Sequence, residues 1–89
     1  MVENLFSQSH IRLRLIREAL QLNRKDFSQI LKVNYRTYNE WEKKEITPSI
    51  EAQKKMIQIG LNPNYLLGDN SPTINGYTFE SIKKNIKEN

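Results

Sequence analysis

The chain has 89 residues, a length that fits a single domain with a modest core. It has no cysteine, which excludes disulfide bonds and thiolate metal sites and leaves helix packing as the source of stability. No segment approaches the roughly 18 apolar residues that a membrane span needs, and the first residues lack the pattern of a secretory signal. We therefore expect a cytoplasmic protein without a membrane partner.

Positive charge is concentrated in the first half of the chain. The whole sequence has 14 Lys and Arg against 10 Asp and Glu, for a net charge of +4. Residues 11–44 alone hold nine of the basic residues and four of the acidic ones. Such an excess is typical of domains that bind nucleic acid, although an ordinary solvated helical surface has the same composition.

Hydrophobic spacing predicts an all-α chain that begins with a helix over residues 9–20, with Ser9 as the expected N-cap. The apolar residues of its inner face recur at helical spacing: Leu13, Ile16 and Leu20. Ile11 and Leu15 fall on nearly the opposite side, so this helix can be covered on two sides.

Two short helices joined by a tight turn are expected next. Asn23 is the predicted cap of a helix that runs through Leu31, and Asn34 is the predicted cap of a helix over residues 35–43. The second of these helices buries two aromatic side chains, Tyr38 and Trp41. Because only a three-residue turn separates them, the two helices form a helix-turn-helix arrangement.

Proline and glycine mark two further helices. A Thr-Pro pair at 47–48 starts a helix that stops at Gly60, and an Asn-Pro pair at 62–63 starts a short fifth helix that stops at Gly68. The fourth helix turns three apolar residues inward: Ala52, Met56 and Ile59.

A polar linker over residues 69–76 leads to a tail in which one more short amphipathic helix is expected. Its apolar residues are Phe79, Ile82 and Ile86. The Asn-Gly pair at 75–76 is also a hairpin-turn signal, but its flanks are short for strands. The tail can cover Ile11 and Leu15 of its own chain or meet its copy in a second subunit, and we favour the partner role.

The uninterrupted run from Leu22 to Glu42 resembles the helix-turn-helix signature of the lambda-repressor-like family, also called the Cro/repressor-type or XRE-type family. The agreement includes Leu22, Phe27, Ser28, Leu31, Val33 and the Trp41-Glu42 pair. Residues 47–51 resemble the start of the family's fourth helix, and residues 60–68 resemble its fifth. The resemblance implies a compact five-helix DNA-binding domain over residues 9–68, with residues 69–89 as linker and helical tail.

Three positions depart from the family's pattern. Lys32 stands where the turn commonly has glycine, so either this lysine adopts a positive φ or the turn is built differently. Lys44 stands where the family usually has glycine after the third helix. Arg24 stands where the family often has a glutamine that contacts a phosphate, which keeps a donor and adds charge.

The outward stripe of the third helix is expected to face the major groove of DNA. Its residues are Tyr35, Arg36, Asn39 and Glu40, with Thr37 at the margin. The resemblance implies base contacts at the positions of Tyr35, Arg36 and Glu40. Arg36 can donate two hydrogen bonds to guanine, and Asn39 can pair with adenine. Glu40 can accept from cytosine or pair with Arg36 one turn earlier.

Phosphate contacts set register and affinity without reading sequence, and they are expected around this stripe. The candidates are Arg24, Asn34, Lys43 and Lys44. The resemblance also implies that Arg17 and Glu42 form a structural pair. His10 stands alone, without an acid, nucleophile or ligand cluster at a useful spacing. The sequence therefore predicts no catalytic residue, no metal and no cofactor, and we do not expect an enzyme.

We expect a sequence-specific regulator of transcription, of phage or mobile-element origin, that represses by binding a palindromic operator as a homodimer. The antitoxin of a toxin-antitoxin pair or the controller of a restriction-modification system would have the same domain. A third alternative is a protein-interaction module that uses this fold without binding DNA. Glu40 and Glu42 favour that module, whereas Arg24, Arg36 and the lysines beside them oppose it.

Overall fold

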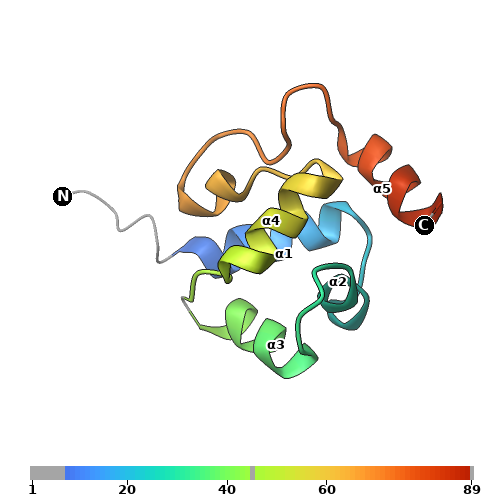
Figure 1. Ribbon diagram of the computed structural model, residues 1–89. Coiled ribbons are helices and arrows are strands. Elements are labelled where there is room, and N and C mark those ends of the chain that lie inside the picture. The colour runs from blue at the N-terminus through green and yellow to red at the C-terminus, as the bar shows by residue number, and fades with distance from the viewer. Residues whose placement is uncertain (1–7, 45, 89) are drawn as a thin grey trace.

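The computed structural model describes residues 8–44 and 46–88, and most of this part of the chain is helical (Figure 1). The elements in chain order are α1 (Ser9–Ala19), α2 (Arg24–Ile30), α3 (Tyr35–Lys43), α4 (Ile50–Ile59), the 3₁₀ helix η2 (Pro63–Leu67) and α5 (Phe79–Glu88). Over these residues, strand-like pairing is limited to one isolated antiparallel bridge between Leu61 and Thr73. The prediction of an all-α chain is confirmed. None of the described helices is both long and apolar enough to cross a membrane.

One hydrophobic core joins all the helices. The helix α1 contacts α3 and η2, α2 packs on α3, and α4 packs on α5 and η2. Figure 1 shows α3 at one edge of the molecule and the connection before α5 at the opposite edge, with α1 and α4 between them. The buried apolar residues are Leu13, Ile16, Leu20, Phe27, Leu31, Tyr38, Trp41, Ala52, Met56, Leu61, Leu66 and Ile82.

Side-chain caps fix the starts of α2 and α3. The Asn23 side chain accepts a hydrogen bond of 2.7 Å from the backbone N–H of Asp26, and the Asn34 side chain accepts one of 2.8 Å from Arg36. An asparagine oxygen at this position satisfies one of the backbone donors that the first turn leaves unpaired. Both predicted caps are confirmed, and α3 has the predicted bounds.

The predicted starts of α1 and α4 are wrong. Gln8 occupies the N-cap position of α1, and the hydroxyl of Ser9 is buried with no hydrogen-bond partner among the described residues. In α4, the cap is Ser49, whose hydroxyl accepts from Ala52 at 3.3 Å, so the Thr-Pro pair at 47–48 precedes the helix. Ser and Thr are both N-cap residues, with Ser the stronger of the two, and the sequence Thr-Pro-Ser offers both.

The fifth helix begins and ends where expected but has a different type. Asn62 caps it by accepting from Asn64 at 3.1 Å, and Gly68 ends it in the left-handed region with φ 118°. Its five residues form a 3₁₀ helix rather than an α-helix. Such short runs are where 3₁₀ geometry is most common.

The tail packs on its own chain. The prediction that its apolar residues contact a second subunit is therefore wrong for the central one, Ile82. Ile82 has no exposed surface and belongs to the common core. The tail does not cover the predicted face of α1 either, because Ile11 and Leu15 remain 41% and 45% exposed. It instead lies by the C-terminal end of α1, where Lys83 Nζ donates to Gln21 Oε1 at 3.3 Å.

The connection between η2 and α5 is tied to the rest of the molecule rather than being a free linker. The backbone N–H of Ile74 donates to the Gly60 carbonyl at 2.8 Å, and Asn62 donates to the Pro72 carbonyl at 3.0 Å. Gly60 has a φ of 104°, and a Cβ there would overlap the ring of Tyr77. Residues 74–77 form a β-turn without flanking strands, so no hairpin is present in this segment.

Candidate nucleic-acid interface

The turn between α2 and α3 is built with a lysine in the conformation that glycine usually takes. Lys32 has a φ of 58°, which settles the alternative that the sequence left open. The backbone N–H of Val33 then donates to the Ser28 carbonyl at 3.0 Å, which closes the end of α2. A side chain in this left-handed region costs roughly 1–2 kcal/mol. The packing of the two helices therefore compensates for a locally unfavourable backbone.

Aromatic packing sets the rotation of α3 about its own axis. Tyr38 and Trp41 are buried, and the Tyr38 ring meets the Phe27 ring of α2 edge to face with centroids 5.6 Å apart. The predicted inward face of α3 is confirmed. Every residue of the predicted stripe has exposed surface: Arg36 and Glu40 lie opposite Tyr38, Tyr35 and Thr37 are also exposed, and Asn39 is half-buried.

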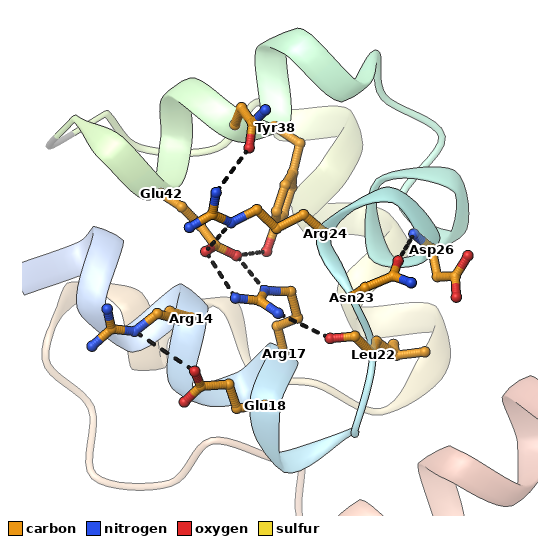
Figure 2. A network of polar contacts seen from close by, with 10 residues as sticks. Arg14, Arg17, Glu18, Leu22, Asn23, Arg24, Asp26, Tyr38 and Glu42 are labelled. Carbon is orange, nitrogen blue, oxygen red and sulfur yellow. Dashed lines mark hydrogen bonds and ion pairs between the residues drawn. The ribbon is translucent and has the colours of Figure 1, made fainter.

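Glu42 is the centre of a polar network that joins three helices (Figure 2). Arg17 of α1 donates to both of its carboxylate oxygens, at 2.7 and 3.2 Å, and Arg24 of α2 donates to one of them at 3.2 Å. The Tyr38 hydroxyl donates to the oxygen that accepts from Arg17 Nε. The Glu42 side chain is only 1% exposed, so a carboxylate there requires these donors. The Arg17–Glu42 pair is present as the resemblance implied.

Ionisation of this network follows from burial and hydrogen bonding. Burial alone would raise the pKa of Glu42, but the hydrogen bonds from Arg17 and Tyr38 and the charges of Arg17 and Arg24 bring the pKa below its ordinary value. The hydrogen bond to Glu42 raises the pKa of Arg17, and burial is the main cause that raises the pKa of Tyr38. Two arginines share one carboxylate, so the network keeps a net positive charge beside α3.

Arg24 is held in place by two hydrogen bonds, and some of its N–H donors have no partner among the described residues. Its Nε binds Glu42, and one Nη donates to the Asn39 side-chain oxygen at 3.4 Å. A guanidinium has five N–H donors, so three remain for a ligand, and the Arg24 side chain is 40% exposed. No local pattern indicates the contacts of Arg24 with Glu42 and Asn39, because the residues lie 18 and 15 positions apart. The Tyr38–Glu42 contact could have been anticipated from its i,i+4 spacing.

The other predicted phosphate-binding residues surround the same surface. Asn34 uses its side-chain oxygen in the cap of α3, which leaves its NH₂ group at the exposed start of the helix. Lys43 and Lys44 are exposed at the other end of α3. Across residues 8–44 and 46–88, no ion pair links Arg36 to Glu40. The structure thus brings the predicted site residues together on α3, at its two ends and at the start of α2.

Other kinds of site have little support in the described part of the chain. No three His, Asp or Glu side chains there come close enough to hold a metal ion. His10 is half-buried, and its Nδ1 has no hydrogen-bond partner among the described residues. The surface of α3 is where the described chain gathers the residues predicted to contact DNA.

Comparisons with known proteins identify no relative of this chain. It matches no protein-family model, no curated protein and no solved structure.

Proposed function

We propose that this protein is a sequence-specific, DNA-binding regulator with a lambda-repressor-like fold, in which α2 and α3 form a helix-turn-helix and α3 enters the major groove. One observation carries the proposal. The polar stripe of α3 faces outward while Tyr38, Trp41 and Glu42 hold its other side against α1 and α2. A recognition helix needs both an exposed set of hydrogen-bonding groups and a rigid support.

The exposed groups of α3 match the edges of bases. Arg36 is free of ion pairs in the described chain and can donate two hydrogen bonds to guanine. Glu40 is not neutralised by Arg36, so its carboxylate can accept from cytosine. Tyr35, 48% exposed at the start of α3, and Thr37 can contact the methyl group of thymine. The side-chain oxygen of Asn39 accepts a hydrogen bond from Arg24. We therefore assign Asn39 the role of positioning Arg24 rather than that of contacting adenine.

The charges around α3 suit the DNA backbone. Arg24 reaches a phosphate with the donors that Glu42 and Asn39 leave free. The NH₂ group of Asn34 supplies a further donor at the start of α3, because the cap uses only the side-chain oxygen. Lys43 and Lys44 supply two further charges at the far end of α3. Such contacts give affinity that depends on salt and fix the register of the helix on the duplex.

The protein-interaction module is the weaker candidate because one of the two acids that favoured it is not on the surface. The carboxylate of Glu42 is buried and paired with two arginines. Only Glu40 remains as an exposed acid on α3, among Arg36, Lys43 and Lys44. That surface is positive and would attract a polyanion.

Selection from a pool of random DNA duplexes tests the proposal. The full chain should enrich a pseudo-palindromic sequence and bind it more tightly than a scrambled duplex at moderate salt. Arg36→Ala should weaken that preference, whereas Lys84→Ala, which removes an exposed charge from α5, should retain it in full. If no sequence is enriched and both duplexes bind equally, the protein does not read DNA sequence.

A further inference from the structure

The helix α4 exposes apolar residues where a monomer would be expected to have polar ones. Ile50 is 60% exposed and Ile57 is 50% exposed. They lie seven residues apart, hence on the same side of the helix, opposite the buried Ala52 and Met56. Isoleucine is among the residues most often buried in folded proteins, so two on one exposed side form an unpartnered face.

Two charged residues flank this apolar pair. Glu51 lies near the start of α4 and Lys54 one turn later, and both are exposed. Neither forms an ion pair within residues 8–44 and 46–88. We call the four residues Ile50, Glu51, Lys54 and Ile57 the α4 face.

We propose that a second copy of this chain covers the α4 face, with the two α4 helices packed antiparallel about a two-fold axis. In that arrangement Ile50 lies opposite Ile57 of the partner subunit, and the symmetry repeats the contact. Glu51 and Lys54 lie on the same flank, three residues apart, so Glu51 of each chain comes beside Lys54 of the partner subunit. The face is therefore complementary to itself in charge, with apolar side chains opposite apolar ones.

The other exposed apolar pair does not have this property. Ile11 and Leu15 of α1 are 41% and 45% exposed, but the charges beside them, Arg14 and Glu18, already pair within the chain at 4.0 Å. A second α1 helix would gain less from these charges, since they have a partner. Unpaired charges of opposite sign beside an apolar pair occur on α4, and this favours α4 as the contact between copies.

This inference rests on the proposed function for its biological use, because a dimer supplies the two recognition helices that read a palindromic site. None of the four residues belongs to the stripe of α3. Two isoleucines on each side make a small apolar centre compared with that of an obligate dimer. We therefore expect reversible association that depends on protein concentration.

Sedimentation of the full chain without DNA tests the inference independently of DNA binding. The chain should pass from monomer to dimer as its concentration rises to the level used for NMR spectroscopy. Glu51→Lys and Lys54→Glu should each weaken the dimer by about tenfold, because two-fold symmetry makes each change act twice. The double variant E51K/K54E restores opposite charges across the axis and should recover most of the association.

Matched apolar substitutions locate the interface. The variant I50D/I57D should abolish dimerisation, and I11D/L15D should leave it unchanged, while thermal melting confirms that each variant is folded. A wild-type chain that stays monomeric throughout the series, a double charge variant that does not recover, or a dimer lost only in I11D/L15D overturns the inference. Loss of DNA selection with an intact α4 dimer would instead contradict the proposed function and leave the interface standing.

Discussion

At the scale of single residues, Glu42 links α3 to two other helices. Its buried carboxylate joins α1 and α2 to α3 through Arg17 and Arg24. Replacing a buried ionic group by well-packed apolar residues is often neutral, so such a network is weak evidence for stability by itself. Its contribution here is to fix where Arg24 and α3 lie relative to each other.

Removing the Glu42 carboxylate should still be costly because it leaves Arg17 with an uncompensated charge. We expect Glu42→Ala to lower the free energy of unfolding by about 3 kcal/mol. Glu42→Gln keeps an acceptor and should cost less. Urea denaturation of the two variants, followed by circular dichroism, measures the difference, and equal losses would show that the charge of Glu42 is unimportant.

The same carboxylate predicts how stability depends on pH. Its pKa in the folded chain lies below the ordinary value of 4.5, so its contribution is fully present above that pH. The contribution is lost as the pH falls through the lower folded pKa. The acid branch of the stability profile should therefore be shallower in Glu42→Gln than in the wild type, and parallel branches would contradict this assignment.

Trp41 is the second residue on which the orientation of α3 depends. It is 5% exposed, and its ring lies 6.1 Å from that of Tyr38. We expect Trp41→Ala to cost about 3–5 kcal/mol, which in so small a domain approaches the whole stability. Thermal melting measures the loss. A variant that melts near the wild-type temperature would mean that this face of α3 is not the inner one.

Arg36 and Arg24 should differ in their effects on DNA binding. Arg36→Ala should lower affinity for the selected duplex by about 1–3 kcal/mol and leave binding to scrambled DNA nearly unchanged. Arg24→Ala should weaken binding to both duplexes and reduce the salt dependence by about one phosphate contact. It should also lower stability, since Arg24 pairs with the buried Glu42. Titrations over a salt series separate the two effects, and an equal loss for both duplexes in Arg36→Ala would make Arg36 a phosphate contact.

At the scale of the elements, the turn between α2 and α3 contains backbone strain at Lys32. A substitution there can relieve it. Lys32 is exposed and has a φ of 58°. Lys32→Gly should raise the free energy of unfolding by about 0.5–1 kcal/mol, because glycine adopts this conformation without a clash. Lys25→Gly, inside α2, should lower it by about 1 kcal/mol. Melting temperatures that shift in the same direction for both variants would contradict the account of the turn.

Helix ends were predictable where one residue type decides them. Asn23 and Asn34 each stand directly before a helix with no competing cap, and Gly60 ends α4 in the left-handed region. The predicted start of α4 is wrong because proline at the first helical position favoured Thr47 as the cap, whereas the cap is Ser49, the residue type with the stronger N-cap preference. The 3₁₀ type of η2 was not predicted, although a run of only five residues is where this geometry is common.

At the scale of the whole molecule, the inward and outward faces of α3 could be predicted from the sequence, and the partners of its charged residues could not. Helical periodicity places Tyr38 and Trp41 on one side whatever surrounds them. The pairing of Arg24 with Glu42 and the burial of Ile82 depend on contacts between distant segments. The lambda-repressor-like assignment and the base contacts stay predictions that the DNA selection tests.

The hydrogen bond between Ile74 and Gly60 has a consequence for how the molecule opens. With Tyr77 over Gly60 and Ile82 in the core, α5 cannot separate without exposing the centre of the domain. In native-state hydrogen exchange, we therefore expect the amides of Ile74 and Ile82 to exchange only through global unfolding, at the same free energy as that of Tyr38. Faster exchange confined to the tail would show that it opens alone. If the tail and the core unfold as one unit, a chain shortened before α5 will not report on the dimer interface, because it will not be folded.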